Sequence, residues 1–439
     1  MKKVLVLGAG LVARPGVRYL LEKGFAVTVA DLVESKALAL LNKHPNGRAK
    51  AWNTDDKQGL AEMVKDADLV VSLLPANFHP LVAQECLAQK KNMVTASYVS
   101  PAMRELDAPA KEAGILILNE IGVDPGIDHM SAMKVIDGVK AAGGKVTSFR
   151  SYCGGLPAPE ANTNPWGYKF SWSPRGVLTA GRNPACYLQD GKKVDIPGPE
   201  LFGDMHILDV TGLCELEAYP NRDSIGYIDI YGLQEARTVF RGTLRYKGWC
   251  AAMKKIVNSG LLDDQERDLK GLTYRDFTAA AITGGKPGNL RADIAARFGV
   301  AQNFHGIDWL EWLGLFSDEP LPVEKGARID VMAARMLLKM PYSEGERDML
   351  VMQHEFIAEY AGGRTEKLTS TLVDYGIPGG DSSMARTVSL PVAIAARLIL
   401  EGRITGTGVQ IPVSPAIYQP VLKELEELPN GVHFEETKN

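Results

Sequence analysis

The sequence predicts an α/β protein in which a Rossmann-type, doubly wound parallel sheet is joined to an α+β domain that carries a helical insertion. Three observations lead to this prediction. Before Gly122, short apolar runs alternate with helical patterns, as in repeated β-α-β units. A glycine-rich turn directly follows the first apolar run. After Gly122 the pattern changes to alternating segments typical of antiparallel strands, and then to a series of helical patterns.

Short runs rich in Val, Ile and Leu predict the strands of the parallel sheet, buried on both faces. These runs are Val4–Leu7, Ala26–Ala30, Leu69–Leu74, Met93–Ala96 and Ile115–Leu118. The spacing of apolar residues between them predicts helices, several of which begin near a proline. These helices are Pro15–Lys23, Glu34–Asn42, Lys57–Lys65, Pro80–Gln89 and Pro101–Ala113. In such a sheet, ligands bind at the carboxyl ends of the strands.

The turn after the first strand, Gly8-Ala9-Gly10-Leu11-Val12-Ala13, fits the pattern G-x-G-x-x-A of dinucleotide-binding proteins. Gly8 allows the tight turn, Gly10 lets a pyrophosphate approach the backbone, and Ala13 keeps the helix close to the strand. Leu11 and Val12 lie where the helix N-terminus offers N–H groups to phosphates. The alternative is a glycine turn in an α/β domain that binds no nucleotide.

Asp31 ends the second predicted strand and indicates which nucleotide is bound. A carboxylate at this position accepts hydrogen bonds from ribose hydroxyls and repels a 2′-phosphate. No arginine occurs in the residues Leu32-Val33-Glu34 that follow. The sequence therefore favours NAD over NADP, with NADP as the alternative cofactor. A second interpretation is that Asp31 only caps the next helix.

The second half of the chain predicts a mostly antiparallel sheet, a helical insertion and a final long helix. A helix is expected at Ile127–Ala141. The alternating segments are Val146–Tyr152, Tyr168–Ser173, Glu215–Tyr219, Thr238–Tyr246, Leu350–Tyr360 and Glu366–Tyr375, the last two joined by a hairpin at Ala361-Gly362-Gly363-Arg364. The helical patterns are Trp249–Gly260, Tyr274–Ile282, Leu290–Phe298, Trp309–Phe316 and Arg328–Met340. The apolar helix Ser383–Glu401 is expected to pack back on the first domain.

These patterns divide the chain into three parts. The dinucleotide-binding domain takes residues 1–124 plus about 383–425. The substrate-binding domain takes 125–248 plus about 341–382, and the helical insertion takes 249–340.

Composition excludes several classes of protein. Apolar residues make up 45% and charged residues 23% of 439 residues, which argues against disorder, and a net charge of −4 argues against nucleic-acid binding. Five widely spaced cysteines without a CxxC pair argue against a disulfide framework and favour a reducing, cytoplasmic location. No uninterrupted apolar run is long enough to predict a membrane span, and no residue cluster has the spacing of a metal site.

Two polar residues in the loops after the predicted strands could carry chemistry. Tyr98 can donate a hydrogen bond, and Asp124 can accept a proton or hold an ammonium group. The alternatives are an aromatic ring packed under its loop for Tyr98 and a capping aspartate before a turn for Asp124. His79 is given little weight as a functional residue, and His129 is as consistent with a packed or solvent-exposed side chain as with an acid–base group.

Arginines indicate an acidic substrate. Arg222 follows a predicted strand, and Arg241, Thr243 and Arg245 alternate on another, so that they share one face. Arginine binds carboxylates in a bidentate manner, which suits a substrate with several acidic groups. The alternative is a set of surface ion pairs.

Several blocks of the sequence together resemble the saccharopine dehydrogenase (L-glutamate-forming) family, also called saccharopine reductase. They are Asn119–His129, Ser151–Glu160, Gly167–Ser173, Tyr219–Ser224, Arg241–Tyr246, Trp312–Asp318 and Ser370–Gly376. The resemblance covers nearly the whole chain. It implies an oxidoreductase of lysine metabolism that oxidises saccharopine to L-glutamate and 2-aminoadipate 6-semialdehyde, reversibly, with a nicotinamide cofactor.

The resemblance also implies site residues. The substrate site would contain Ser97, Tyr98, Asp124, Arg222, Thr243, Leu244 and Arg245. The cofactor site would add Val123, Pro125 and Ser173 to the glycine turn and Asp31. Leu74 and Pro75 are further cofactor candidates because their loop lies at the carboxyl end of a predicted strand. Tyr98 and Asp124 are the candidates for proton transfer. The family's second domain carries a pairing sheet, which implies a homodimer and a dimerisation role for the α+β domain.

The sequence departs from the family pattern in two places. Family members from fungi that use NADP carry Cys-Arg where this chain has Ala30-Asp31, which again favours NAD here. Ala76-Asn77 replaces a Tyr-Thr pair in the loop after the third predicted strand. Two alternatives stay open: a related amine–aldehyde reductase such as carboxynorspermidine dehydrogenase, and a non-catalytic NAD-sensing protein.

Overall fold

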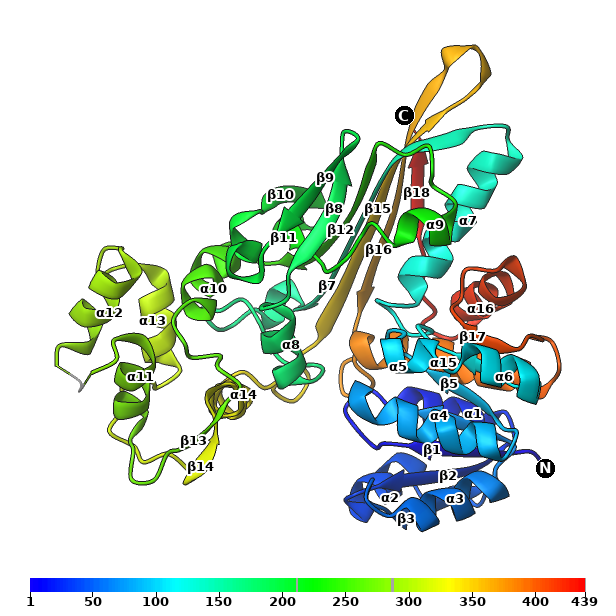
Figure 1. Ribbon diagram of the computed structural model, residues 1–439, viewed down its shortest axis with the longest axis horizontal. Coiled ribbons are helices and arrows are strands. Elements are labelled where there is room, and N and C mark those ends of the chain that lie inside the picture. The colour runs from blue at the N-terminus through cyan, green and yellow to red at the C-terminus, as the bar shows by residue number, and fades with distance from the viewer. Residues whose placement is uncertain (211, 286–287, 439) are drawn as a thin grey trace. The chain divides into compact units, whose positions relative to one another are not determined.

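The computed structural model describes residues 1–210, 212–285 and 288–438 (Figure 1). The chain divides into two compact units. Unit 1 comprises Met1–Lys145, Tyr360–Gly362 and Leu372–Glu435, and unit 2 comprises Val146–Glu359, Gly363–Thr371 and Glu436–Asn439.

Unit 1 contains a parallel sheet of seven strands in the order β17-β6-β5-β4-β1-β2-β3. The strands are β1 (Lys3–Leu7), β2 (Ala26–Asp31), β3 (Gly47–Ala51), β4 (Leu69–Ser72), β5 (Asn92–Thr95), β6 (Leu116–Leu118) and β17 (Gly408–Gln410). The order 3-2-1-4-5-6 within it is that of a Rossmann fold, whose ligands bind where the strand order reverses, between β1 and β4. The predicted fold class and the five predicted strands are confirmed.

The predicted helices of unit 1 are present, with one correction, and the last helix of the unit, α16, was not predicted. They are α1 (Arg14–Glu22), α2 (Glu34–Leu41), α3 (Lys57–Asp66), the short η1 (Ala76–Phe78), α4 (His79–Ala88), α5 (Pro101–Arg104), α6 (Asp107–Ala113), α7 (Ile127–Ala141), α15 (Ser383–Leu400) and α16 (Pro415–Glu427). The single helix predicted at Pro101–Ala113 is wrong, because the structure has two helices there. Pro109 lacks the N–H that a continuous helix would need to bond to the carbonyl of Glu105.

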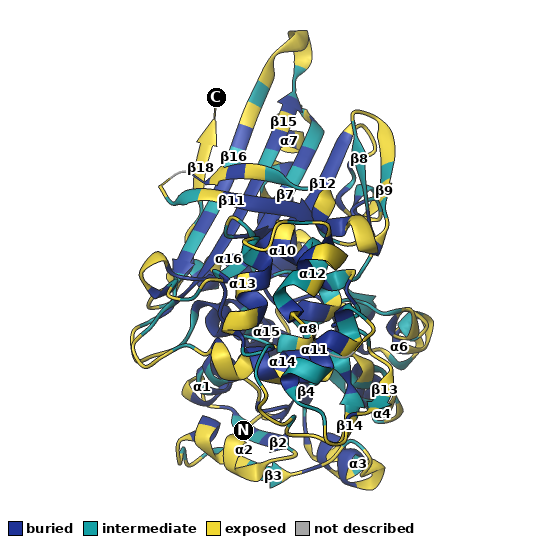
Figure 2. Cartoon of the chain, turned by 90° about the vertical axis from the view of Figure 1, so that its left-hand side faces the viewer, coloured by how far each residue is buried: buried dark blue, intermediate teal, exposed yellow. Residues whose placement is uncertain are grey.

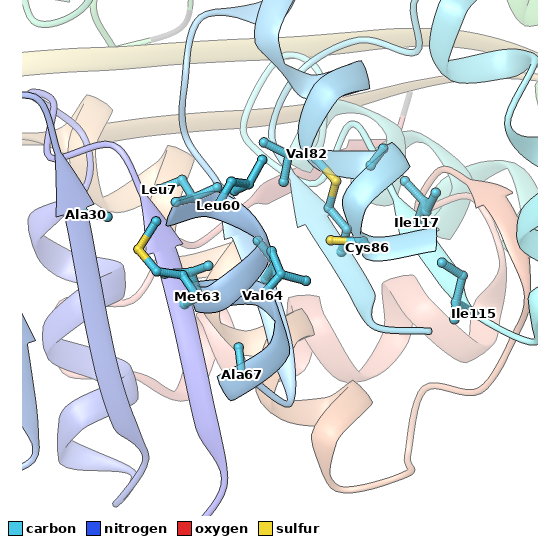
Figure 3. Packing of buried hydrophobic residues seen from close by; sticks show 14 of the residues in the cluster. Leu7, Ala30, Leu60, Met63, Val64, Ala67, Val82, Cys86, Ile115 and Ile117 are labelled. Atoms are coloured by element: carbon cyan, nitrogen blue, oxygen red, sulfur yellow. The ribbon is translucent and has the colours of Figure 1, made fainter. Parts of the chain in front are cut away.

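The core between the sheet and its helices is apolar. Figure 3 shows Leu60 and Val64 of α3, and Val82 and Cys86 of α4, packed in one cluster with strand residues such as Ile117. These side chains are almost fully buried. This packing holds the carboxyl ends of the strands in place for the loops that follow them.

Helix α15 packs back on the first part of the chain, as predicted. A Cβ atom at Gly16 of α1 would come within 2.8 Å of the Ser389 carbonyl oxygen, so glycine allows the close approach of the two helices. The Gly16 N–H also donates to Ser389 Oγ at 3.0 Å. Within the described residues, α15 is the one helix long and apolar enough to cross a membrane. However, 78% of its apolar window is buried, as in the core helix of a globular domain.

Unit 2 is built on a nine-stranded mixed sheet with the order β10-β11-β12-β7-β15-β16-β18, to which β8 and β9 add beside β12. The strands are β7 (Lys145–Pro157), β8 (Ala185–Gln189), β9 (Lys192–Ile196), β10 (His206–Val210), β11 (Cys214–Pro220), β12 (Thr238–Arg245), β15 (Asp348–Glu359), β16 (Thr365–Tyr375) and β18 (Glu435–Lys438). The pair β12–β7 is parallel, whereas β10–β11 and β11–β12 are antiparallel. Most residues of β7, β12 and β15 are buried, as the dark blue strands in Figure 2 show. The hairpin between β15 and β16 is confirmed as the turn η4 (Ala361–Gly363).

The strand predicted at Tyr168–Ser173 is wrong. The structure has an irregular segment there that leads into α8 (Pro174–Ala180). Consecutive residues 168–171 are all buried, so the apparent alternation does not mark an inside and an outside face. Their backbone groups bond elsewhere: the Tyr168 carbonyl accepts from Asn164 Nδ2 at 2.7 Å, and the Phe170 N–H donates to the Met340 carbonyl at 3.2 Å.

The remaining helices lie in unit 2. They are α9 (Tyr227–Tyr231), α10 (Trp249–Val257), α11 (Tyr274–Ile282), α12 (Leu290–Phe298), α13 (His305–Trp312) and α14 (Arg328–Lys339), with the short strand pair β13 (Glu266–Asp268) and β14 (Lys325–Ala327). Helix α13 ends earlier than the predicted helix Trp309–Phe316. The segment 249–340 lies within unit 2, and α7 lies in unit 1. A separate helical insertion stays a prediction.

Candidate active site

The glycine turn after β1 fits a dinucleotide. Gly8 has φ +102°, and a Cβ atom there would lie 2.9 Å from the Leu73 carbonyl oxygen, so only glycine suits this position. No atom lies within 4 Å of the position of a Cβ at Gly10, and Leu11 is 62% exposed. The backbone of the turn is therefore open to a ligand, directly before α1 begins. A pyrophosphate needs this approach to N–H groups at a helix N-terminus.

Asp31 lies beside this turn. One of its carboxylate oxygens accepts from the Ala9 N–H at 2.7 Å, and the other accepts from the Val33 N–H at 2.9 Å. The N-cap of α2 is Val33, so Asp31 is not the capping residue of that helix. The carboxylate instead joins the end of β2 to the glycine turn, which is where a ribose-binding acid is expected.

The loop after β4 contains Leu74 and Pro75 and leads through η1 into α4. The first residue of α4 is His79, whose ring is buried and bonded on both sides. Nδ1 lies 2.9 Å from Ser72 Oγ, and Nε2 lies 2.7 Å from Ser97 Oγ. Burial lowers the pKa of His79 from 6.5 to about 4, so the ring is neutral at pH 7. Sequence reasoning gave this residue little weight, because a histidine in a loop before a proline has no distinguishing pattern.

The buried His79 should make stability depend on pH. Between pH 6.5 and about 4 the unfolded chain binds a proton that the folded chain does not, so stability is present above pH 6.5 and is lost as the pH falls toward 4. Over that range, we expect the free energy of unfolding of the wild type to fall by about 3 kcal/mol more than that of His79→Gln. Urea unfolding at a series of pH values measures this. Parallel curves for the two proteins would contradict it.

The two candidate proton-transfer residues meet in unit 1. Tyr98 follows β5, Asp124 follows β6, and the Tyr98 hydroxyl donates to Asp124 Oδ1 at 2.9 Å. Tyr98 is thus more than an aromatic ring packed under its loop. Val123 and Pro125 flank Asp124: the Gly122 N–H donates to the Pro125 carbonyl at 2.9 Å, and the Asp128 N–H donates to the Val123 carbonyl at 3.0 Å. These contacts fix the loop at the start of α7.

Glu120 supports this pair, although the sequence analysis did not identify it. It has φ +56°, an unusual backbone conformation for a residue other than glycine. Its N–H donates to the Ser97 carbonyl at 3.1 Å, and its carboxylate accepts from the Val99 N–H at 2.9 Å. The other carboxylate oxygen lies 2.8 Å from Nε2 of the buried His129. Glu120 therefore holds the backbone on both sides of Tyr98, and His129 is a buried supporting residue.

Arg245, at the end of β12 in unit 2, is a buried cation. It is 5% exposed, and its guanidinium carbon lies 4.9 Å from the centre of the Tyr168 ring and 5.4 Å from that of Trp249. Nη1 donates to the Leu244 carbonyl at 2.7 Å. Among the described residues, Nε has no hydrogen-bond partner and no carboxylate forms an ion pair with this guanidinium. The alternative of a surface ion pair is therefore wrong for Arg245.

The other predicted residues of unit 2 lie at several places. Thr243 pairs in register with Tyr219 of β11, and Leu244 is fully buried against Gly154. Arg222 follows β11, with φ +55°, and its carbonyl accepts from the Cys186 N–H at 2.9 Å. The Asn221 N–H donates to the Arg241 carbonyl, so Arg222, the next residue after Asn221, lies near Arg241 of β12. Arg245 lies further along β12, where its backbone is in register with Glu217 of β11.

Arg241 and Ser173 have local partners. The guanidinium carbon of Arg241, which is 2% exposed, lies 4.4 Å from the centre of the Tyr227 ring. Ser173 is the N-cap of α8 and accepts from the Gly176 N–H at 3.2 Å. The structure thus gives Ser173 a structural role, and its cofactor role stays a prediction. Within the described ranges, no group of His, Cys, Asp and Glu residues could hold a metal ion.

Comparison with known proteins agrees with this geometry. Residues 4–118 match the model of the saccharopine dehydrogenase NADP binding domain, and residues 122–429 match that of the saccharopine dehydrogenase C-terminal domain. The chain is 42% identical to saccharopine dehydrogenase [NADP(+), L-glutamate-forming] of Saccharomyces cerevisiae, covering 99% of both chains. It is 40% identical to the mitochondrial alpha-aminoadipic semialdehyde synthase of Bos taurus over 97% of this chain and 47% of the relative.

A solved structure extends the comparison to three dimensions. The apo saccharopine dehydrogenase (L-Glu forming) of Saccharomyces cerevisiae has a TM-score of 0.88 to this chain, covering 100% of both chains. The predicted preference for NAD is not supported by the comparisons. The domain model and the fungal relatives are named for NADP. The predicted resemblance itself is confirmed, and this chain belongs to the saccharopine dehydrogenase (L-glutamate-forming) family.

Proposed function

We propose that this chain oxidises the secondary amine of saccharopine, giving L-glutamate and 2-aminoadipate 6-semialdehyde, as an enzyme of lysine metabolism. The observation that carries the proposal is the buried guanidinium of Arg245, which has no carboxylate partner among the described residues. A buried charge is costly unless it is paired, so a ligand carboxylate is the expected partner. Saccharopine has three carboxylates, and full-length relatives are named for this reaction.

The reaction balances with one nucleotide and one water. A nicotinamide dinucleotide held by the glycine turn would supply the hydride acceptor for the carbon beside the secondary nitrogen. The nitrogen must first lose its proton, for which Asp124 is the base of the Tyr98–Asp124 pair. Water then adds to the carbon–nitrogen double bond. The bond between that carbon and nitrogen breaks, so glutamate leaves with the amine and the semialdehyde with the carbonyl.

The chain's own residues have separate tasks in this scheme. Arg222 and Arg245 bind substrate carboxylates, with Ser97, Thr243 and Leu244 as further contacts. The residues that would hold the nucleotide are Gly8, Gly10, Leu11, Val12, Asp31, Leu74, Pro75, Val123, Pro125 and Ser173.

Turnover with different amines separates this function from its rivals. We expect oxidised nucleotide and saccharopine to give an absorbance rise at 340 nm and equal amounts of glutamate. In the reverse direction, glutamate should serve as the amine and diaminopropane should not, which excludes a carboxynorspermidine dehydrogenase. Nucleotide binding without turnover of any amine–aldehyde pair would favour the NAD-sensing alternative and contradict the proposal.

Within this function we propose that NAD is the preferred nucleotide, although the relatives are named for NADP(+). The Asp31 carboxylate, beside the glycine turn, would repel a 2′-phosphate. We expect kcat/KM to be higher with NAD, and Asp31→Asn to shift the NADP/NAD ratio toward NADP by about tenfold, equivalent to about 1.4 kcal/mol. The asparagine oxygen can still accept from Ala9 N. Asp55→Asn is the control, and a wild type that prefers NADP tenfold would refute the proposal.

A homodimer and a cytoplasmic location complete the proposal. Within the described residues, Cys86, Cys186, Cys214 and Cys250 form no disulfide, which suits a reducing compartment. Analytical ultracentrifugation of the purified chain tests the dimer.

A further inference from the structure

His79 links the ends of two neighbouring strands at the candidate active site. Its ring lies between Ser72, the last residue of β4, and Ser97, which follows β5, at 2.9 and 2.7 Å from their hydroxyl oxygens. Thr95 Oγ1 lies 3.3 Å from the same Nε2 atom. His79 is 1% exposed, so water does not compete for these bonds. Because the ring is buried, His79 can act on a bound ligand only through a neighbouring residue.

The neighbour that His79 can control is the Ser97 hydroxyl. A neutral imidazole has one N–H donor and one acceptor nitrogen, so its proton decides whether the serine oxygen accepts or donates. The backbone of Ser97 is already fixed, because its carbonyl accepts from the Glu120 N–H at 3.1 Å and its N–H donates to Thr95 Oγ1 at 3.3 Å. With the backbone held, the hydroxyl group of Ser97 can still rotate. Ser97 is half-buried, so its hydroxyl is not closed off from a ligand.

We propose that His79 is a positioning residue that fixes the direction of the Ser97 hydroxyl toward the substrate. The inference rests on the proposed function, in which Ser97 contacts saccharopine. Without His79 the hydroxyl rotates among several partners, and its hydrogen bond to the substrate is lost for much of the time. A fixed hydroxyl contributes to substrate binding or turnover and leaves nucleotide binding unchanged.

Two amide variants divide the contacts of the imidazole ring. Glutamine places its amide near the position of Nε2 and can reach Ser97, as donor or acceptor. Asparagine places its amide near Nδ1 and can reach only Ser72. His79→Gln should therefore keep kcat/KM for saccharopine within about threefold of the wild type, whereas His79→Asn should lower it about tenfold, the size of one lost hydrogen bond.

A double-mutant cycle with Ser97→Ala tests whether His79 acts through Ser97. We expect Ser97→Ala to lower kcat/KM for saccharopine about tenfold, and His79→Asn to add less than twofold in that background. The nucleotide Kd, measured by fluorescence of the reduced nucleotide, should stay within twofold in all four proteins. Thermal unfolding confirms that each variant is folded.

Each other result overturns the inference. A purely structural role would give the same tenfold loss from His79→Asn with and without Ser97, or a loss in His79→Gln as large as in His79→Asn. A parallel loss of nucleotide affinity would show that His79 acts on the Leu74–Pro75 loop. A wild type that neither binds nor oxidises saccharopine refutes the proposed function, and the inference with it. Failure of the inference alone shows as an active wild type without coupling between His79 and Ser97.

Discussion

Replacing Arg245 by alanine should lower kcat/KM for saccharopine by about 30- to 1000-fold, equivalent to roughly 2–4 kcal/mol of lost binding. The guanidinium is buried between Tyr168 and Trp249, so a carboxylate bound to it would be shielded from water and held strongly. The loss should appear mainly in the KM for saccharopine. The nucleotide Kd should change by less than twofold, because Arg245 is assigned to the substrate site and not to the nucleotide site.

Two further variants make this prediction specific. Arg245→Lys keeps the charge but loses the planar fork, and we expect an intermediate loss. Arg175→Ala removes an arginine of the same unit that is 52% exposed and paired with Asp330, and it should leave both constants unchanged. An unchanged saccharopine KM in a folded Arg245→Ala protein would remove this residue from the substrate site.

Asp124→Asn should lower kcat by about 100- to 10,000-fold, the usual contribution of a positioned acid–base group. The asparagine can still accept the hydrogen bond from the Tyr98 hydroxyl at nearly the same geometry, but it cannot take up a proton. Tyr98→Phe should cost less, about tenfold, because the carboxylate stays and loses one hydrogen bond. Steady-state kinetics at saturating saccharopine and nucleotide measures both effects.

The chain offers a matched control for Asp124. Asp137 of α7 also accepts a hydrogen bond from a tyrosine, with the Tyr418 hydroxyl 2.7 Å from its Oδ2, but it is outside the candidate site. Asp137→Asn should therefore keep the kcat of the wild type. A kcat of Asp124→Asn within tenfold of the wild type would mean that the substrate nitrogen loses its proton to another group.

The central strands were predictable because burial on both faces demands continuous apolar runs. Edge strands are less buried, so they need no continuous apolar run. Strand β3, Gly47-Arg48-Ala49-Lys50-Ala51, has no buried residue and lies at the edge of the sheet beside β2, so its sequence carries little strand signal. Strand β17 has three residues and depends on β6 for its position. In unit 2, the alternation of aromatic and polar residues at 168–171 predicted a strand that does not form. All four residues are buried, so the alternation does not separate an inner face from an outer face.

The candidate site was predictable where residues follow neighbouring strands. Strands β5 and β6 are adjacent and parallel, so the loops that carry Tyr98 and Asp124 had to come together. The supporting residues were not predictable, since the roles of His79 and Glu120 depend on contacts with Ser97 and Val99, which only the folded chain creates. Likewise, no spacing rule distinguishes the buried Arg245 from a surface arginine.

The transfer of hydride from saccharopine to the nucleotide can be followed with an isotope label. Saccharopine that carries two deuterium atoms at the carbon that becomes the aldehyde is incubated with oxidised nucleotide. The reduced nucleotide and the amino acid are then analysed by mass spectrometry. We expect one deuterium in each reduced nucleotide and an equal amount of unlabelled glutamate. Reduced nucleotide without deuterium, or deuterated nucleotide formed without glutamate, would contradict it.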